Sequence, residues 1–178
     1  ALARSFHRGI HRLATMEKPF VTAINGPAAG AGLSLAILGD IALTAASAHF
    51  TSAYSAVGLT PDGGASWWLP RLIGMRRAQE MIFTNRRIGA EEAAGMGLVT
   101  RVVADDRLRA EASAVASTLA KGPIRALARC RSLLVESINA DLSTQLDREA
   151  APISESAGAA EGREGVAAFL AKRPPHFV

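Results

Sequence analysis

The chain lacks the residues and segments that mark several large classes of protein. Among its 178 residues there is one cysteine, Cys130, which excludes an intramolecular disulfide and argues against an extracellular disulfide scaffold. Aromatic residues make up only 5% of the sequence and no zinc-finger spacing occurs, which argues against a nucleic-acid-binding protein. The longest apolar runs, such as 33–38, are too short to span a bilayer, and no signal peptide opens the chain. These absences predict a soluble, cytoplasmic protein with no membrane partner.

The residues that are present fit a globular protein with an anionic ligand. The sequence is 49% hydrophobic and 20% charged, a composition that allows one domain with a substantial core. Its net charge is +4 and its pI is about 10.0. An excess of positive charge favours a negatively charged partner, and we expect this to be phosphate on a small molecule.

Hydrophobic periodicity predicts strands in the first part of the chain and helices after them. Residues 1–16 have the spacing of an amphipathic helix, and strands are expected at 20–24, 41–44 and 49–51. After a loop rich in glycine and proline, the pattern from residue 65 onward is almost entirely helical, with breaks expected near Pro152 and Gly158. This order predicts one α/β or α+β domain.

The expected strands are too few for a complete sheet. Three short strands fall below the usual number for such a domain, and the sequence opens inside a helix with no residue to cap it. We therefore expect that N-terminal strands are missing from this sequence.

A segment of small residues, 25–36, follows the first expected strand. Its glycines and alanines let a ligand approach the backbone, and the N–H groups of the next helical turn can stabilise negative charge, as in an oxyanion hole. The alternative is that the small residues only allow a helix to pack closely on a strand. Ser34 also gives a partial match to the nucleophile elbow of serine hydrolases, but that serine must follow a strand directly, and Ser34 is expected inside a buried helix.

Asp62 lies in a Pro-Asp-Gly-Gly sequence that is typical of a turn. The residues around this turn suggest a second role, because they are large and apolar. Apolar surroundings strengthen a carboxylate as a base, so Asp62 is a candidate for proton transfer. The apolar neighbours in the sequence are Val57, Leu59, Trp67 and Trp68.

The histidines suggest no metal site. His7 and His11 have i, i+4 spacing on one helix, but no third ligand accompanies them, and a solvated basic face explains them better. His49, His176 and Cys130 have no partner in the sequence and receive no chemical role.

Taken in order, these motifs resemble the enoyl-CoA hydratase/isomerase (crotonase) family along essentially the whole chain. The strand and glycine-rich turn, the Gly-Leu-Thr-Pro-Asp-Gly-Gly loop and the last helix carry most of the resemblance. The matching segments are 18–26, 28–32, 35–36, 39–40, 57–64, 69–74, 93–99 and 164–173.

The resemblance implies a fold, an assembly and a class of substrate. Members fold as a spiral of ββα turns followed by helices that form homo-trimers, often paired into a dimer of trimers. We accordingly divide the chain into a spiral core with active-site loops, 1–104, and a helical oligomerisation region, 105–178. The substrates are coenzyme A thioesters, with no metal and no cofactor beyond the CoA of the substrate. The family's second oxyanion donor lies in the missing N-terminal segment, so this chain should not form a complete active site alone.

The resemblance also assigns roles to individual residues. The N–H of Ala31 stabilises the thioester enolate, and Asp62 matches a proton-transferring aspartate of the phenylacetate-pathway and dienoyl-CoA isomerases. The two glutamates of the family's hydratases match Ser34 and Tyr54 here. Phe169 and Lys172 match a C-terminal helix that approaches a neighbouring subunit's CoA. The residues expected to bind substrate are Ala29, Gly30, Tyr54, Gly58, Leu59, Trp67, Phe169 and Lys172.

The sequence therefore predicts an enoyl-CoA isomerase that works through a thioester enolate. Without the two glutamates, hydration loses the acid/base pair that activates water. Three alternatives stay open: a hydratase with substituted acid/base residues, an acyl-CoA thioesterase or dehalogenase, and a family member that binds acyl-CoA without turnover.

Overall fold

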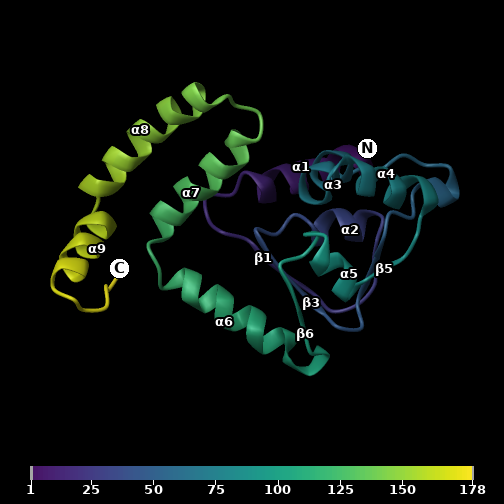
Figure 1. Ribbon diagram of the computed structural model, residues 1–178, viewed down its shortest axis with the longest axis horizontal. Coiled ribbons are helices and arrows are strands. Elements are labelled where there is room, and N and C mark those ends of the chain that lie inside the picture. Colours follow the sequence, from purple (N-terminus) through teal and green to yellow (C-terminus); the bar gives the residue numbers. More distant parts are fainter. Residues whose placement is uncertain (1, 178) are drawn as a thin grey trace. The chain divides into compact units, whose positions relative to one another are not determined.

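The computed structural model describes residues 2–177 and divides into two compact units (Figure 1). The first contains residues up to 14 together with 20–114, and the second contains 15–19 and the residues from 115 onward. Each is described here by itself. The functional division at 104/105 stays a prediction.

One parallel sheet of the first unit contains two predicted strands, β1 and β3, and a third, β6, in the part of the chain that was expected to be almost entirely helical. β3 lies at its centre between β1 and β6, and Ile24 pairs with Thr44 at the end of the β1–β3 ladder. The side chain of Asp40, just before β3, accepts a hydrogen bond of 2.7 Å from the N–H of Phe20, just before β1. The strands are β1 (Val21–Ile24), β3 (Ile41–Ala45) and β6 (Arg101–Val103).

A second small sheet positions the glycine-rich turn. β2 pairs in parallel with β4, so that Ala29 lies opposite Thr51, and β4 pairs with β5 in antiparallel fashion. Because β2 and β4 are parallel, the segments that follow them leave the sheet at the same end. The strands are β2 (Ala28–Ala29), β4 (His49–Thr51) and β5 (Ile88–Gly89).

Short helices of the first unit pack against these sheets and bury a common core. Leu33, Leu43, Phe50, Leu69 and Met81 are all fully buried, and each such side chain contributes about 1.5–3 kcal/mol through loss of water contact. The helices are α1 (Leu2–Ala14), α2 (Ala31–Ala36), η1 (Ser55–Val57), α3 (Ala65–Ile73), α4 (Met75–Thr84), α5 (Ala90–Gly95), η2 (Asp105–Arg107) and the first half of α6 (Leu108–Ala120).

The second unit is helical and differs from the sequence prediction at one proline. It contains the end of α6, α7 (Ile124–Ser137), α8 (Leu142–Gly158) and α9 (Ala160–Leu170). The prediction that Pro152 breaks a helix is wrong, because α8 continues through it to Gly158. A proline removes only one backbone donor, so a 17-residue helix retains its other hydrogen bonds. The first turn of α8 is also capped, because the Asp141 side chain accepts a hydrogen bond of 2.8 Å from the Thr144 N–H.

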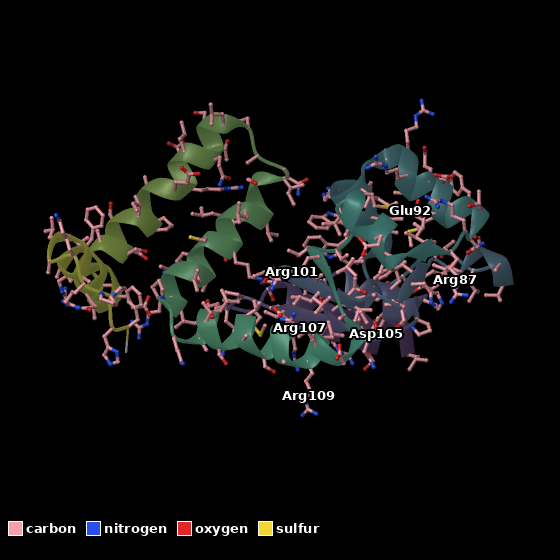
Figure 2. All side chains as sticks on the ribbon, turned by 60° about the horizontal axis from the view of Figure 1, so that its bottom comes forward. Arg87, Glu92, Arg101, Asp105, Arg107 and Arg109 are labelled. Carbon is pink, nitrogen blue, oxygen red and sulfur yellow. The ribbon has the colours of Figure 1, made fainter. Side chains whose placement is uncertain are left out.

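Two charged side chains at the surface of the first unit, Asp105 and Arg86, connect neighbouring segments of the chain. The Asp105 carboxylate, labelled in Figure 2, accepts hydrogen bonds from the side chain and the N–H of Ser47, and both bonds lower the pKa of Asp105. Arg86 pairs with Glu92 in α5.

Within the described part of the chain, no group of three or more His, Cys, Asp or Glu is arranged to hold a metal ion. Nor does 2–177 contain a helix with the length and apolarity needed to cross a membrane.

Candidate active site

The glycine-rich turn connects β2 to α2 and exposes its backbone. Gly30 has φ 54° and ψ −124°, a conformation that favours glycine, and it caps the helix whose first residue is Ala31. Ala29 and Ala31 are both exposed. Because the first N–H groups of an α-helix have no acceptor inside the helix, the turn is a suitable donor site for a developing oxyanion.

Asp62 lies in the loop before α3, and two hydroxyl groups hold it. The Tyr54 hydroxyl donates to the carboxylate oxygen Oδ1 of Asp62. The Ser34 hydroxyl donates to the Asp62 backbone carbonyl at 2.9 Å. Tyr54 precedes η1 and Ser34 lies in α2, so two separate elements fix the aspartate. These are the two positions that the resemblance matches to hydratase glutamates.

His7 of α1 also lies beside Asp62, which the sequence analysis missed. Its Nε2 atom is 3.6 Å from Oδ2 of Asp62 and accepts a hydrogen bond of 3.3 Å from the Gly63 N–H. The assignment of His7 to a solvated basic face is therefore incomplete, since only half of its side chain is exposed. The two residues are 55 positions apart in the sequence, and no local pattern signals this contact.

Two glycines after Asp62 allow the loop to approach α1 and α2. Gly63 and Gly64 have φ values of 58° and 83°, which favour glycine. A Cβ atom on Gly63 would lie 2.5 Å from the Phe6 ring and 2.9 Å from Cβ of Ser34, so no larger residue fits. This close packing brings Asp62 within reach of its partners.

The expected apolar surroundings of Asp62 are only partly present. Val57 and Leu59 are 71% and 61% exposed, and Gly58 is exposed with them, because η1 and the following residues turn toward solvent. The immediate neighbours of the carboxylate are instead the polar groups of Tyr54 and His7. Asp62 keeps its candidacy as a base through these contacts and its position rather than through an apolar envelope.

The tryptophans lie in α3 directly after the loop. Trp67 and Trp68 pack edge to face with their ring centroids 4.5 Å apart, and the Arg71 guanidinium stacks 4.0 Å above the Trp67 ring. Both rings are half-buried. The stacked arginine partly covers Trp67, a residue that we expected to bind substrate.

Ser34 is not a nucleophile of the elbow type. It is fully buried in the fourth position of α2, where its hydroxyl also lies 3.5 Å from the Gly30 carbonyl oxygen. The alternative of a serine hydrolase is thereby excluded on geometry, since the elbow requires an exposed serine directly after a strand. The expectation of a buried serine inside a helix is confirmed.

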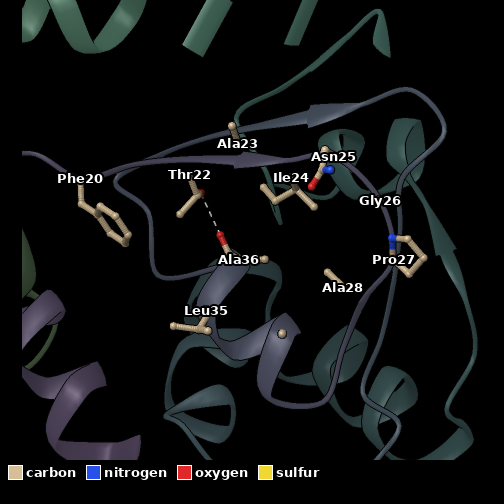
Figure 3. A pocket seen from close by; sticks show the side chains of 11 residues that line it. Phe20, Thr22, Ala23, Ile24, Asn25, Gly26, Pro27, Ala28, Leu35 and Ala36 are labelled. Carbon is tan, nitrogen blue, oxygen red and sulfur yellow. Dashed lines mark hydrogen bonds between the residues drawn. The ribbon is translucent and has the colours of Figure 1, made fainter. Parts of the chain in front are cut away.

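An open cavity of about 510 Å³ lies on another face of α2 (Figure 3). β1 and the turn after it form one wall, and Leu35, which is 41% exposed, lies on the helix side with Gly32 and Ala36. Asp62, Tyr54 and His7 do not line it. Because Gly32, Leu35 and Ala36 share one face of the helix while Ser34 bonds to Asp62, α2 separates the cavity from the carboxylate.

Phe169 and Lys172 belong to the second unit. Phe169 is 81% exposed near the end of α9, and Lys172 is exposed just beyond it with a φ of 51°. Arg173 pairs with Glu164, and this hydrogen bond, together with one from the His176 N–H, lowers the pKa of Glu164 to about 2. Phe169 and Lys172 are therefore accessible, and the Arg173–Glu164 pair holds the segment after α9 against that helix.

Comparisons with known proteins agree on one family. The model described as "Enoyl-CoA hydratase/isomerase" matches residues 2–178. A Rhodobacter capsulatus protein described as "Probable enoyl-CoA hydratase" is 45% identical over 89% of this chain and 62% of its own length. The 1,2-epoxyphenylacetyl-CoA isomerase of Escherichia coli K12 is 40% identical over 99% of this chain and 68% of its own length.

A solved structure extends the agreement to three dimensions. The crystal structure of an enoyl-CoA hydratase from Polaromonas sp. JS666 superposes with a TM-score of 0.95 at 37% identity, covering 99% of this chain and 68% of that protein. The chain therefore spans between 62% and 68% of the length of these three proteins.

Proposed function

We propose, since the chain belongs to the enoyl-CoA hydratase/isomerase family, that its full-length protein isomerises the double bond of an enoyl-CoA through a thioester enolate. The mixed α/β fold is the crotonase-like fold that the sequence predicts. The observation that carries the proposal is the single carboxylate, Asp62, held by Tyr54 and Ser34 at the positions of the hydratase glutamates.

The proposed reaction assigns separate tasks to the backbone and the carboxylate. Asp62 removes a proton from a carbon of the acyl chain next to the double bond. The electrons move toward the thioester, and the Ala31 N–H stabilises the negative oxygen of the enolate. Asp62 then returns the proton to another carbon of the conjugated system, so that the double bond has moved and atoms balance. No metal takes part, and CoA enters only as part of the substrate.

Hydration is less well supported by these residues. Adding water to a double bond requires one group to activate the water and another to protonate the carbon. Between Asp40 and Glu80 the sequence contains no acidic residue other than Asp62. This part of the site therefore supplies one carboxylate where a hydratase uses two.

The contact between His7 and Asp62 favours a second candidate, a thioesterase or dehalogenase. A carboxylate nucleophile with a histidine base beside it forms a pair suited to hydrolysis, and Nε2 of His7 is 3.6 Å from Oδ2 of Asp62. In the present arrangement Nε2 accepts from the Gly63 N–H, which uses its lone pair. A base needs this lone pair, so isomerisation remains the leading proposal.

Product analysis separates these functions. The full-length protein is incubated with cis-3-enoyl-CoA and with trans-2-enoyl-CoA, and the products are identified by mass and retention time. Interconversion of the two enoyl-CoA esters supports the isomerase. Hydroxyacyl-CoA identifies a hydratase, free CoA identifies a hydrolytic member, and binding without any product identifies a non-catalytic member.

We also propose that the helical second unit assembles the protein as a homo-trimer or a dimer of trimers. Several apolar side chains of this unit lie at the surface: Leu134 of α7 is 70% exposed and Ile138, just after it, is 42% exposed. Leu142 and Ile153 of α8 are exposed as well. Exposed apolar side chains in such number favour burial against another subunit. A trimeric mass by light scattering supports this assembly, and a monomeric mass contradicts it.

In that assembly we expect Lys172 to contact a phosphate of CoA at a neighbouring subunit's site, beside Phe169. Replacing Lys172 with alanine should raise the KM for acyl-CoA several-fold at low salt, because an exposed charge pair of roughly 1 kcal/mol is lost, and should leave kcat unchanged. Steady-state kinetics at two salt concentrations measure the effect. Lys121→Ala, at the end of α6, is the matched control, and an equal KM for Lys172→Ala and the unmodified protein contradicts the role.

A further inference from the structure

Tyr54 joins the two halves of the candidate site. Its hydroxyl donates to Oδ1 of Asp62, while its ring lies against the glycine-rich turn, where a Cβ atom on Gly30 would be 3.8 Å from Cζ of the ring. The side chain is half-buried. Tyr54 therefore spans from the turn before Ala31 to the carboxylate of Asp62.

The three oxygen atoms of Asp62 each have a different partner. Ser34 holds the backbone carbonyl and Tyr54 holds Oδ1, which leaves Oδ2 as the oxygen on the side of His7. A turn alone does not fix a side chain, because the carboxylate can rotate about its two torsions. Proton transfer depends on orientation, and a displacement of about 1 Å can cost on the order of a hundredfold in rate.

We propose that Tyr54 is a positioning residue, which holds the Asp62 carboxylate by Oδ1 and so fixes the orientation of Oδ2 for proton transfer, and is not itself a substrate-binding residue. The orientation role rests on the proposed function, because it needs Asp62 to transfer a proton. The contact itself does not, and it is measurable in the absence of turnover.

The phenol is suited to act as a permanent donor. Burial, followed by the hydrogen bond to Asp62, raises the pKa of Tyr54 above its ordinary value of 10.0. The group therefore stays protonated through the neutral range and donates to the carboxylate at every pH where a thioester enzyme works. Ser34 and Asp62 are the groups that act on the phenol, and His7 approaches the same carboxylate from α1.

The first measurement is the titration of Tyr54 by the absorbance of tyrosinate. Tyr54 is the single tyrosine of these 178 residues, and the signal that disappears in Tyr54→Phe isolates it in the full-length protein. In Asp62→Asn the midpoint should fall, because the charge and the hydrogen bond that hold the proton on the phenol are weakened. Asp106→Asn, in η2, is the control and should leave the midpoint in place. An unchanged midpoint in Asp62→Asn overturns the proposal.

The second measurement compares kinetic constants. Tyr54→Phe keeps the ring and removes only the hydroxyl, so kcat should fall about tenfold while KM stays the same, as expected for one lost hydrogen bond to a charged group. Thr51→Val, which removes another hydroxyl in the same region, bonded to the Asn85 carbonyl at 3.0 Å, should change neither constant. A rise in KM at unchanged kcat would restore the substrate-binding role and overturn the positioning role.

The outcomes of the two measurements distinguish an error in the proposed function from an error in the positioning role. If the unmodified protein forms no isomerised product but the Tyr54 midpoint still responds to Asp62→Asn, the proposed function is wrong and the contact stands. The kinetic comparison then uses the product that the unmodified protein does form. If isomerisation is observed and Tyr54→Phe keeps full kcat, the proposed function stands and the positioning role is wrong.

Discussion

Asp62→Asn is expected to reduce turnover of the full-length protein by about 10²- to 10⁴-fold, the usual contribution of a general base. The change keeps the size of the side chain and its suitability for a turn, and the amide oxygen can still accept from the Tyr54 hydroxyl. Only the capacity to take a proton is lost. Initial rates with cis-3-enoyl-CoA measure the effect.

The control for this substitution is a carboxylate outside the site. Asp106→Asn should keep normal turnover, and both variants should bind an acyl-CoA that cannot react with unchanged affinity. A cooperative thermal transition near that of the unmodified protein shows that Asp62→Asn is folded. If this folded variant turns over within a few-fold of normal, Asp62 is a turn residue and another group transfers the proton.

The sequence predicts three of the four strands that have three or more residues in the described part of the chain. β1, β3 and β4 were all expected, because runs of three to five apolar or β-branched residues end at clear turn residues. β2, β5 and β6 were not expected. β2 and β5 have two residues each, too few for any periodicity, and the three residues of β6 lie in the part of the chain where the pattern is almost entirely helical. Such short strands are defined by their pairing with a neighbouring strand, as β5 is where Ile88 lies opposite Phe50 of β4.

The residues of the candidate site also differ in whether a local sequence pattern predicts them. Ala31 and Asp62 could be selected because each lies in a local motif, a glycine-rich turn or a Pro-Asp-Gly-Gly loop. His7 could not, because its contact with Asp62 depends on how α1 packs over the loop, at the place where Gly63 leaves no space beside Phe6. The hydrogen bond from Tyr54 to Asp62 could not be predicted for a related reason: a sequence match indicates that a position faces the site, but not what it bonds to.

The surroundings of Asp62 show the limit of reading an environment from neighbours in sequence. Val57 and Leu59 are five and three positions away in the sequence, which predicts an apolar pocket around the carboxylate. In the fold they point to solvent, and the groups that contact the carboxylate come from α1 and from the residue before η1. Chain distance is a poor guide in a loop, because a loop has no fixed periodicity that places neighbours on one face.

Ala31→Pro is expected to lower the rate by about a hundredfold or more, which is the usual cost of removing one donor from an oxyanion hole. Ala31 is the first residue of α2, where a proline fits the helix and where the lost N–H has no acceptor inside it. The residue before it, Gly30, has no Cβ to oppose the proline ring. The substitution therefore removes the donor without breaking the helix.

The kinetic pattern distinguishes this role from simple packing. The oxyanion forms only during the reaction, so kcat should fall much more than KM rises. Ala31→Ser is the matched control, because it adds an atom to the same exposed side chain and keeps the N–H, and it should retain most of the rate. If Ala31→Pro and Ala31→Ser have similar rates in folded proteins, the small residues of 25–36 serve close packing, and the enolate is stabilised elsewhere.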